Sequence, residues 1–152
     1  MRLSHRTIYG LRAVVDLAYH GGDEPVQAQK IAERAQIPGQ FLGQIFQELK
    51  RAEIVASKRG PGGGYFLVAP AEELTLARIL EALEDLPEVP EVARERSCGE
   101  SGGVAAVADE MCGEVVERMV GLWEEVTIAD LVERGEALGV PRQGYEGFVY
   151  VI

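Results

Sequence analysis

The sequence has few of the features on which secreted and membrane proteins depend. Its 152 residues include only 2 cysteines, too few for a disulfide framework. No apolar run approaches the roughly 18–20 residues that a membrane span needs. The start, MRLSHRTIYG, has no continuous apolar core followed by a cleavage site, so we do not expect a secretory signal. We expect a cytoplasmic protein without a membrane partner.

Enzyme-like residue sets and a positive net charge are also missing. We find no Ser/His/Asp set, no paired acids of a cleft and no His/Cys spacing typical of zinc, so we do not expect an enzyme. The net charge of −10 argues against nucleic-acid binding if the whole chain is considered. Residues 1–68, however, carry nine Lys/Arg against six Asp/Glu, whereas residues 69–152 carry six against nineteen. This asymmetry indicates an N-terminal half that contacts nucleic acid and an acidic half that faces away from it.

The N-terminal half contains three short helical patterns. Ile8, Leu11, Val15 and Ala18 have helical spacing and predict a helix over 6–20. A second helix is expected over 27–35 and a third over 40–52. The third helix has an apolar stripe of Phe41, Leu42, Ile45, Phe46 and Leu49. Its opposite, polar face includes Gln40, Gln44, Gln47 and Lys50.

Two β-like runs, 54–57 and 65–68, flank the glycine-rich stretch SKRGPGGGYFL. A nucleotide-binding loop would need a helix after it and a Lys-Ser/Thr pair at its end, and Pro61 removes an amide donor. The stretch could be a hairpin tip without function. It could also be a wing that touches DNA, where glycines let the backbone approach phosphate or the minor groove. The wing candidates are Lys58, Arg59, Gly60, Gly62, Gly63 and Gly64.

Three helices followed by a hairpin predict a mainly α fold with a small β-hairpin wing, the winged helix-turn-helix. In that architecture the third helix enters the major groove. A fourth helix is expected over 74–86. From 104 to 126 an apolar stripe continues without enough following chain to cover it, so we expect it to pair with a second copy. The stripe consists of Val104, Val107, Met111, Val115, Met119, Leu122 and Val126. A capping box at Thr127 predicts a last helix that ends before Gly139.

Four stretches together carry a specific resemblance. They are MRLSHRTIYGLRAVVDLA, IAERAQIPGQFLGQIFQELKRAEIV, RGPGGGYFL and LTLARILEALE. They resemble the IscR/NsrR/CymR-type (Rrf2) family of bacterial winged helix-turn-helix regulators. The resemblance implies a winged domain over 1–86, a loop or sensor segment over 87–103, a dimerisation helix with a capping helix over 104–138 and a tail over 139–152.

The resemblance also implies a homodimeric transcription factor that binds a palindromic operator. The base-reading positions fall on Gln40, Gln44, Gln47 and Lys50, and the wing contact falls on Arg59. Base-reading relatives often have glutamate where this chain has Gly43, which suggests a different or looser operator.

Many members of this family carry a 2Fe–2S cluster, usually on three closely spaced cysteines. This chain offers Cys98 and Cys112, with His5 as a nearby candidate and Asp109, Glu110 or Glu114 as further options. Alternatively, Cys98 is a simple loop thiol or a reversible thiol switch, and Cys112 is a small apolar side chain of the helix.

We therefore expect a homodimeric DNA-binding regulator, which could be a repressor or an activator. Helix 40–52 and wing 57–65 are expected to bind the operator. A redox or iron–sulfur signal could modulate this binding. The alternative is a regulatory protein that acts mainly by binding a partner protein, with weak or lost DNA contact. The acidic C-terminal half and the apolar tail FVYVI motivate this alternative.

Overall fold

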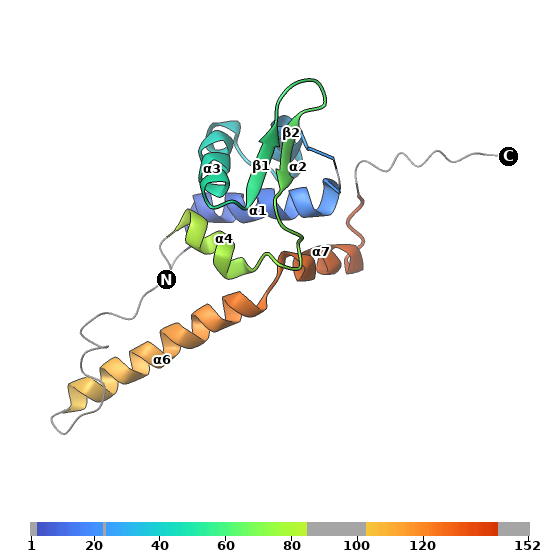
Figure 1. Ribbon diagram of the computed structural model, residues 1–152. Helices are drawn as coiled ribbons and strands as arrows, with labels where there is room; N and C mark the ends of the chain where they lie inside the picture. The colour runs from blue at the N-terminus through green and yellow to red at the C-terminus, as the bar shows by residue number, and fades with distance from the viewer. Residues whose placement is uncertain (1–2, 23, 85–102, 143–152) are drawn as a thin grey trace.

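The computed structural model describes residues 3–22, 24–84 and 103–142. A small winged domain is followed by one long helix, which projects away from it, and by a short helix that returns beneath it (Figure 1). The described elements are α1 (His5–His20), α2 (Ala28–Arg34), α3 (Gly39–Arg51), β1 (Val55–Lys58), β2 (Gly64–Leu67), α4 (Leu76–Leu83), α6 (Val104–Glu125) and α7 (Ile128–Ala137).

Helix α1 is the central helix, and α3, α4 and α7 all pack against it. It begins after Ser4, whose hydroxyl accepts a hydrogen bond from the Thr7 amide. The predicted apolar stripe is not its most buried face. Ile8 is 36% exposed, and the most buried side chains are instead Thr7, Ala13, Val14, Asp16, Leu17 and Tyr19. The hydrophobic pattern missed this face because three neighbouring elements also bury small and polar residues.

Helices α2 and α3 form the helix-turn-helix. The core side of α3 buries the residues that its stripe predicted, namely Leu42, Ile45, Phe46 and Leu49. Phe41 is the exception, because it is 37% exposed at the rim. Its ring lies beside that of Tyr9 on α1, with centroids 5.6 Å apart.

The two strands form the antiparallel hairpin that the sequence predicted. Their register runs from Val55 opposite Leu67 to Lys58 opposite Gly64. Val26 extends the hairpin by one bridge, in which it exchanges two backbone hydrogen bonds of 2.8 Å with Tyr65. This bridge fixes the hairpin to the segment that precedes α2.

The C-terminal helices are joined to the winged domain at one end of α6. The Leu76 amide donates to the Val126 carbonyl, and the Ile128 amide donates to the Leu74 carbonyl, both at 2.8 Å. We call this backbone link the Thr75–Thr127 bridge. Helix α4 ends at Leu83, and the residues from 85 to 102 lie outside the described part of the chain. Leu76, the first residue of α4, is half-buried.

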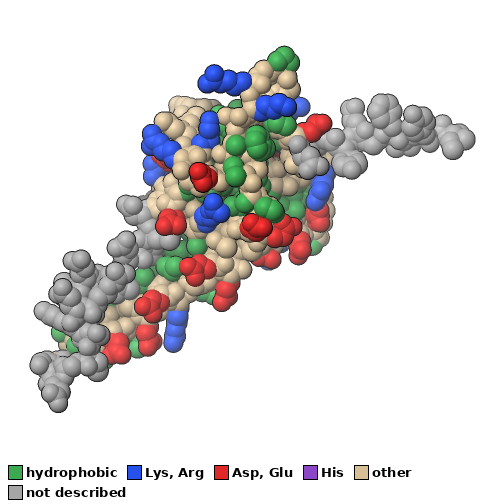
Figure 2. Space-filling model, viewed as in Figure 1, with side chains coloured by type: hydrophobic (Ala, Val, Ile, Leu, Met, Phe, Trp, Pro, Cys, Tyr) green, Lys and Arg blue, Asp and Glu red, His purple; other side chains and the backbone are tan. Residues whose placement is uncertain are grey.

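The surface reproduces the charge asymmetry of the sequence. In the view of Figure 2, basic side chains gather over the hairpin and the α3 side, while acidic side chains follow α6 and α7. Within the described ranges, no helix combines the length and apolar character that crossing a membrane requires.

Candidate nucleic-acid interface

The polar face of α3 is open to solvent. Its predicted base-reading residues are all exposed, namely Gln40, Gln44, Gln47 and Lys50. Gly43 is exposed on the same helix, and a Cβ atom placed on it would meet nothing within 4 Å. Glycine is therefore not required there by packing within the chain. The opposite side of α3 is fixed in the core, so this polar face is held rigidly.

Helix α3 and the hairpin are joined by two side-chain contacts. The ring of Phe46 stacks on that of Tyr65, with centroids 3.9 Å apart and planes inclined by 8°. Near the end of α3, the Lys50 ammonium donates to the Ser57 hydroxyl at 2.9 Å. The helix and the hairpin are thus positioned relative to each other by both an apolar and a polar contact.

The hairpin tip places two cations in solvent beside four glycines. Lys58, Arg59 and Gly60 are exposed. Gly60 has φ +95 and Gly62 has φ +72, in the left-handed region that favours glycine, and both have open space around them. Gly64 has a different reason to be glycine, because its Cβ would lie 2.3 Å from the Val26 carbonyl oxygen. The turn and the hairpin anchor therefore account for these glycines irrespective of any DNA contact.

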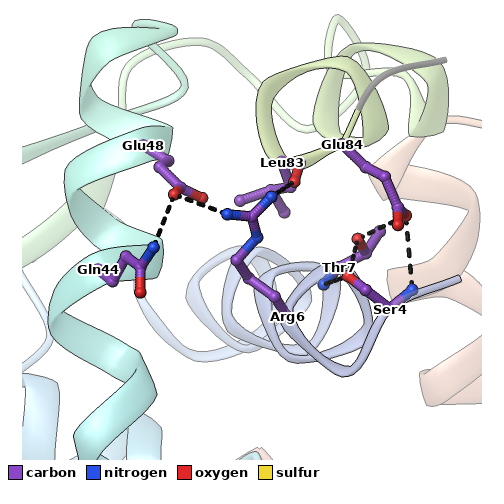
Figure 3. Close-up of polar contacts among 7 residues, drawn as sticks. All are labelled: Ser4, Arg6, Thr7, Gln44, Glu48, Leu83 and Glu84. Atoms are coloured by element: carbon purple, nitrogen blue, oxygen red, sulfur yellow. Dashed lines mark hydrogen bonds and ion pairs between the residues drawn. The ribbon is translucent and has the colours of Figure 1, made fainter.

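A charged side chain behind α3 is connected to its polar face. Glu48 accepts a hydrogen bond from Gln44 at 3.3 Å and forms an ion pair with Arg6 of α1 at 3.1 Å (Figure 3). The 44/48 spacing is visible in the sequence, because positions four apart on a helix are neighbours. Sequence reasoning nevertheless missed this contact set, since Arg6 lies far away along the chain.

The apolar stripe of α6 is directed away from the winged domain. Helix α6 packs against α4, and the α6 residue buried most completely is Gly113. The predicted stripe lies on the other side, where Val104 is 89%, Val107 64%, Met111 58%, Val115 55% and Leu122 62% exposed. Met119 and Val126 are half-buried.

The structure describes only some of the candidate ligands of an iron–sulfur cluster. Nowhere within them do three or more His, Cys, Asp or Glu side chains gather as a metal site would require. Cys112 is an exposed free thiol on α6, and the ring of His5 lies beside that of Tyr9. Glu114 pairs with Arg118 at 3.6 Å. Cys98 lies outside the described part of the chain.

Comparison with known proteins covers nearly the whole chain. Residues 3–134 match the Rrf2 family, described as an iron-dependent transcriptional regulator. The chain belongs to the Rrf2 family of transcriptional regulators. This agrees with the expectation that it is not an enzyme, and it confirms the resemblance found in the sequence.

Relatives in the Rrf2 family agree in sequence and in structure. The HTH-type transcriptional regulator IscR of Serratia proteamaculans is 31% identical over 140 residues, which cover 92% of this chain and 84% of the relative. The structure of IscR from T. potens superposes with a TM-score of 0.71 at 28% identity and covers 95% of both chains. CymR of B. subtilis, a global cysteine regulator, gives a TM-score of 0.72 at 26% identity, with 88% of this chain and 98% of that one covered. The winged helix-turn-helix fold is therefore established.

Proposed function

We propose that this chain is a cytoplasmic, homodimeric regulator that binds a palindromic operator with α3 in the major groove and the hairpin as a wing. The observation that carries the proposal is the joint between α3 and the hairpin, where Phe46 stacks on Tyr65. This joint holds an exposed, glutamine-rich helix face and a basic loop tip as one surface. Such a surface suits simultaneous contact with base edges and with phosphate.

The chemistry of the exposed side chains suits DNA. A glutamine amide can donate to N7 and accept from the N6 amino group of adenine, which reads that base in the major groove. Arg59 is suited to the narrow minor groove, because a guanidinium is more weakly hydrated than an ammonium. Open space at Gly43 suits close approach of α3 to the groove.

The exposed stripe of α6 supports the dimer. It is a continuous row of large apolar side chains on a helix of 22 residues, and a large exposed apolar patch marks an interaction site. A second copy offers a matching stripe, which a two-fold axis would place face to face. Two recognition helices related by that axis would read a palindrome.

Direct binding measurements test the proposal. A random-sequence duplex library is selected with the full chain, and the enriched duplex is titrated by fluorescence anisotropy at several salt concentrations. We expect an enriched palindrome and a fall of log K with log salt of about 0.9 for each phosphate neutralised. No enriched sequence, or binding without salt dependence, would contradict DNA recognition and favour the alternative of a partner-binding regulator.

The signal requires a separate measurement. An iron–sulfur or redox signal is supported by the family description, iron-dependent transcriptional regulator, and not by the donor set of the described residues. Anaerobic purification followed by iron and sulfide analysis shows whether the protein carries a cluster or none. A colourless, iron-free protein that still binds the selected duplex would exclude a resident cluster.

A further inference from the structure

One acidic residue of α3 is connected to the base-reading face and also to the body of the winged domain. The Glu48 Oε1 atom accepts from Gln44 Nε2 at 3.3 Å and from Arg6 Nη1 at 3.1 Å (Figure 3). The side chain of Glu48 is only 19% exposed, whereas Gln44 is exposed. A solvent-facing glutamine is therefore held by a largely buried carboxylate.

The same arginine also holds the end of α4. Arg6 Nη2 donates to the carbonyl of Leu83, the last residue of α4. Next to it, the Glu84 carboxylate accepts from the Thr7 hydroxyl at 2.8 Å and from the Ser4 amide at 3.5 Å. The planar guanidinium of Arg6 thus joins α3 to α4 from its place on α1.

The second carboxylate oxygen of Glu48 lacks the hydrogen bond that Arg6 could donate to it. Glu48 Oε2 is buried and has no hydrogen-bond partner among the described residues. Arginine and carboxylate usually pair through two parallel hydrogen bonds, but here the second arm of Arg6 is used by Leu83. A buried acceptor without a donor is unfavourable, so Oε2 would gain from a hydrogen bond with the Nη2 amino group of Arg6, which donates to the Leu83 carbonyl instead.

We propose that Arg6 and Glu48 are positioning residues for base reading by Gln44, and that the Leu83 carbonyl keeps them in that arrangement. When the end of α4 moves away, Nη2 of Arg6 turns to Glu48 Oε2, and the rearranged carboxylate no longer orients Gln44. Helix α4 packs against α6. A movement of α6 that displaces α4 would therefore change the orientation of Gln44 on α3, through the contacts of Arg6 and Glu48. The proposal rests on the proposed function, since it assumes that α3 reads DNA.

The test measures specificity, not affinity alone. The probes are the duplex selected by the full chain and a scrambled duplex of the same composition, and the readout is the ratio of their dissociation constants. Gln44→Ala is expected to lower this ratio by about 5- to 150-fold, the range for one good bidentate base contact. Glu48→Ala is expected to lower it about threefold or more, with no weakening on the scrambled duplex.

A double-mutant cycle separates positioning from general stability. In the Gln44→Ala background, Glu48→Ala is expected to change the ratio no further, because the residue that it positions is gone. Glu48→Met keeps the approximate length but removes both acceptor oxygens, so it replaces Glu48→Ala if that variant does not fold. Arg6→Lys is expected to lower the ratio as well, since one ammonium cannot reproduce both arms of the fork.

The chain offers a matched control on α2. Gln29 donates to Glu33 at 3.0 Å with the same spacing of four residues, and Glu33→Ala is expected to leave the ratio unchanged. Strictly additive losses from Gln44→Ala and Glu48→Ala, or an unchanged ratio in folded Glu48→Met and Arg6→Lys, would overturn the positioning role. If the unmodified chain selects no duplex at all, the proposed function fails instead, so the two failures are distinguishable.

Discussion

Tyr65 of β2 lies flat on Phe46 of α3, with ring centroids 3.9 Å apart and planes inclined by 8°. Tyr65 also exchanges two backbone hydrogen bonds with Val26. A single residue thus joins the hairpin to the recognition helix through its ring and to the segment before α2 through its backbone. Together with the Lys50–Ser57 hydrogen bond, this residue sets the relative position of wing and recognition helix.

The first prediction concerns that joint. Tyr65→Ala should lower the free energy of unfolding by about 1–3 kcal/mol, as expected for the loss of a half-buried aromatic side chain that packs on the core. Tyr65→Phe should stay within about 1 kcal/mol, because the stacked ring remains. Urea unfolding followed by circular dichroism measures both. Equal stability of the two variants would show that the ring contact has little effect.

The second prediction concerns the phosphate and base contacts. Arg59→Ala and Lys50→Ala should each weaken binding of the selected duplex, and a lost phosphate contact should reduce the salt slope by about 0.9. Arg134→Ala on α7 is the control, because it removes an exposed cation from the acidic half of the chain. If the control weakens binding as much as the other two variants, the effect is net charge and not a site.

The third prediction concerns the dimer. Met111→Glu and Val115→Glu place charge in the exposed stripe of α6 and should shift the chain towards monomer, as sedimentation equilibrium would show. Glu117→Lys changes an exposed charge outside the stripe and should leave the association unchanged. A chain that is monomeric without any substitution would contradict the dimer directly.

The fourth prediction concerns the buried ion pair between α1 and α2. Asp16 is 7% exposed, and Arg34 donates to its two oxygens at 3.0 and 2.7 Å. Asp16→Ala leaves the guanidinium without its partner and should lower the free energy of unfolding by about 3–5 kcal/mol. Glu33→Ala, on the exposed side of α2, should change stability by less than about 0.5 kcal/mol. Thermal and urea unfolding of the two variants provide the comparison.

The fifth prediction concerns the capping box of α7. Hydrogen bonds from the Thr127 amide and hydroxyl lower the pKa of Asp130 below its ordinary value of 3.8. A lowered folded-state pKa means that the stabilisation is complete above the ordinary value and is lost as the pH falls through the folded one. Thr127→Ala should raise the pKa of Asp130 towards 3.8, as measured by carboxyl NMR titration. Because the backbone amide of residue 127 remains in this variant, a pKa that does not change would show that the hydroxyl contributes nothing and that the amide alone lowers it.

The sequence predicted the elements of the winged domain well, because periodicity and glycine-rich turns are local signals. The hairpin, the α3 core stripe and the capping box at Thr127 follow from neighbouring residues, and the structure confirms them. The stripe of α1 was only partly informative: Leu11, Val15 and Ala18 pack partly against the core, but the most buried face depends on which elements pack around that helix. The sequence could not predict the Arg6–Glu48 contact either, because it joins residues 42 positions apart in the chain.

The Thr75–Thr127 bridge has a consequence for the length of the operator. Two backbone hydrogen bonds fix the end of α6 to the winged domain. Pairing of α6 in a dimer would therefore fix the distance and orientation between the two winged domains. Each inserted base pair turns one half-site by roughly a tenth of a helical turn around the DNA axis. A protein with this connection should tolerate changed bases between the half-sites far better than a changed number of them.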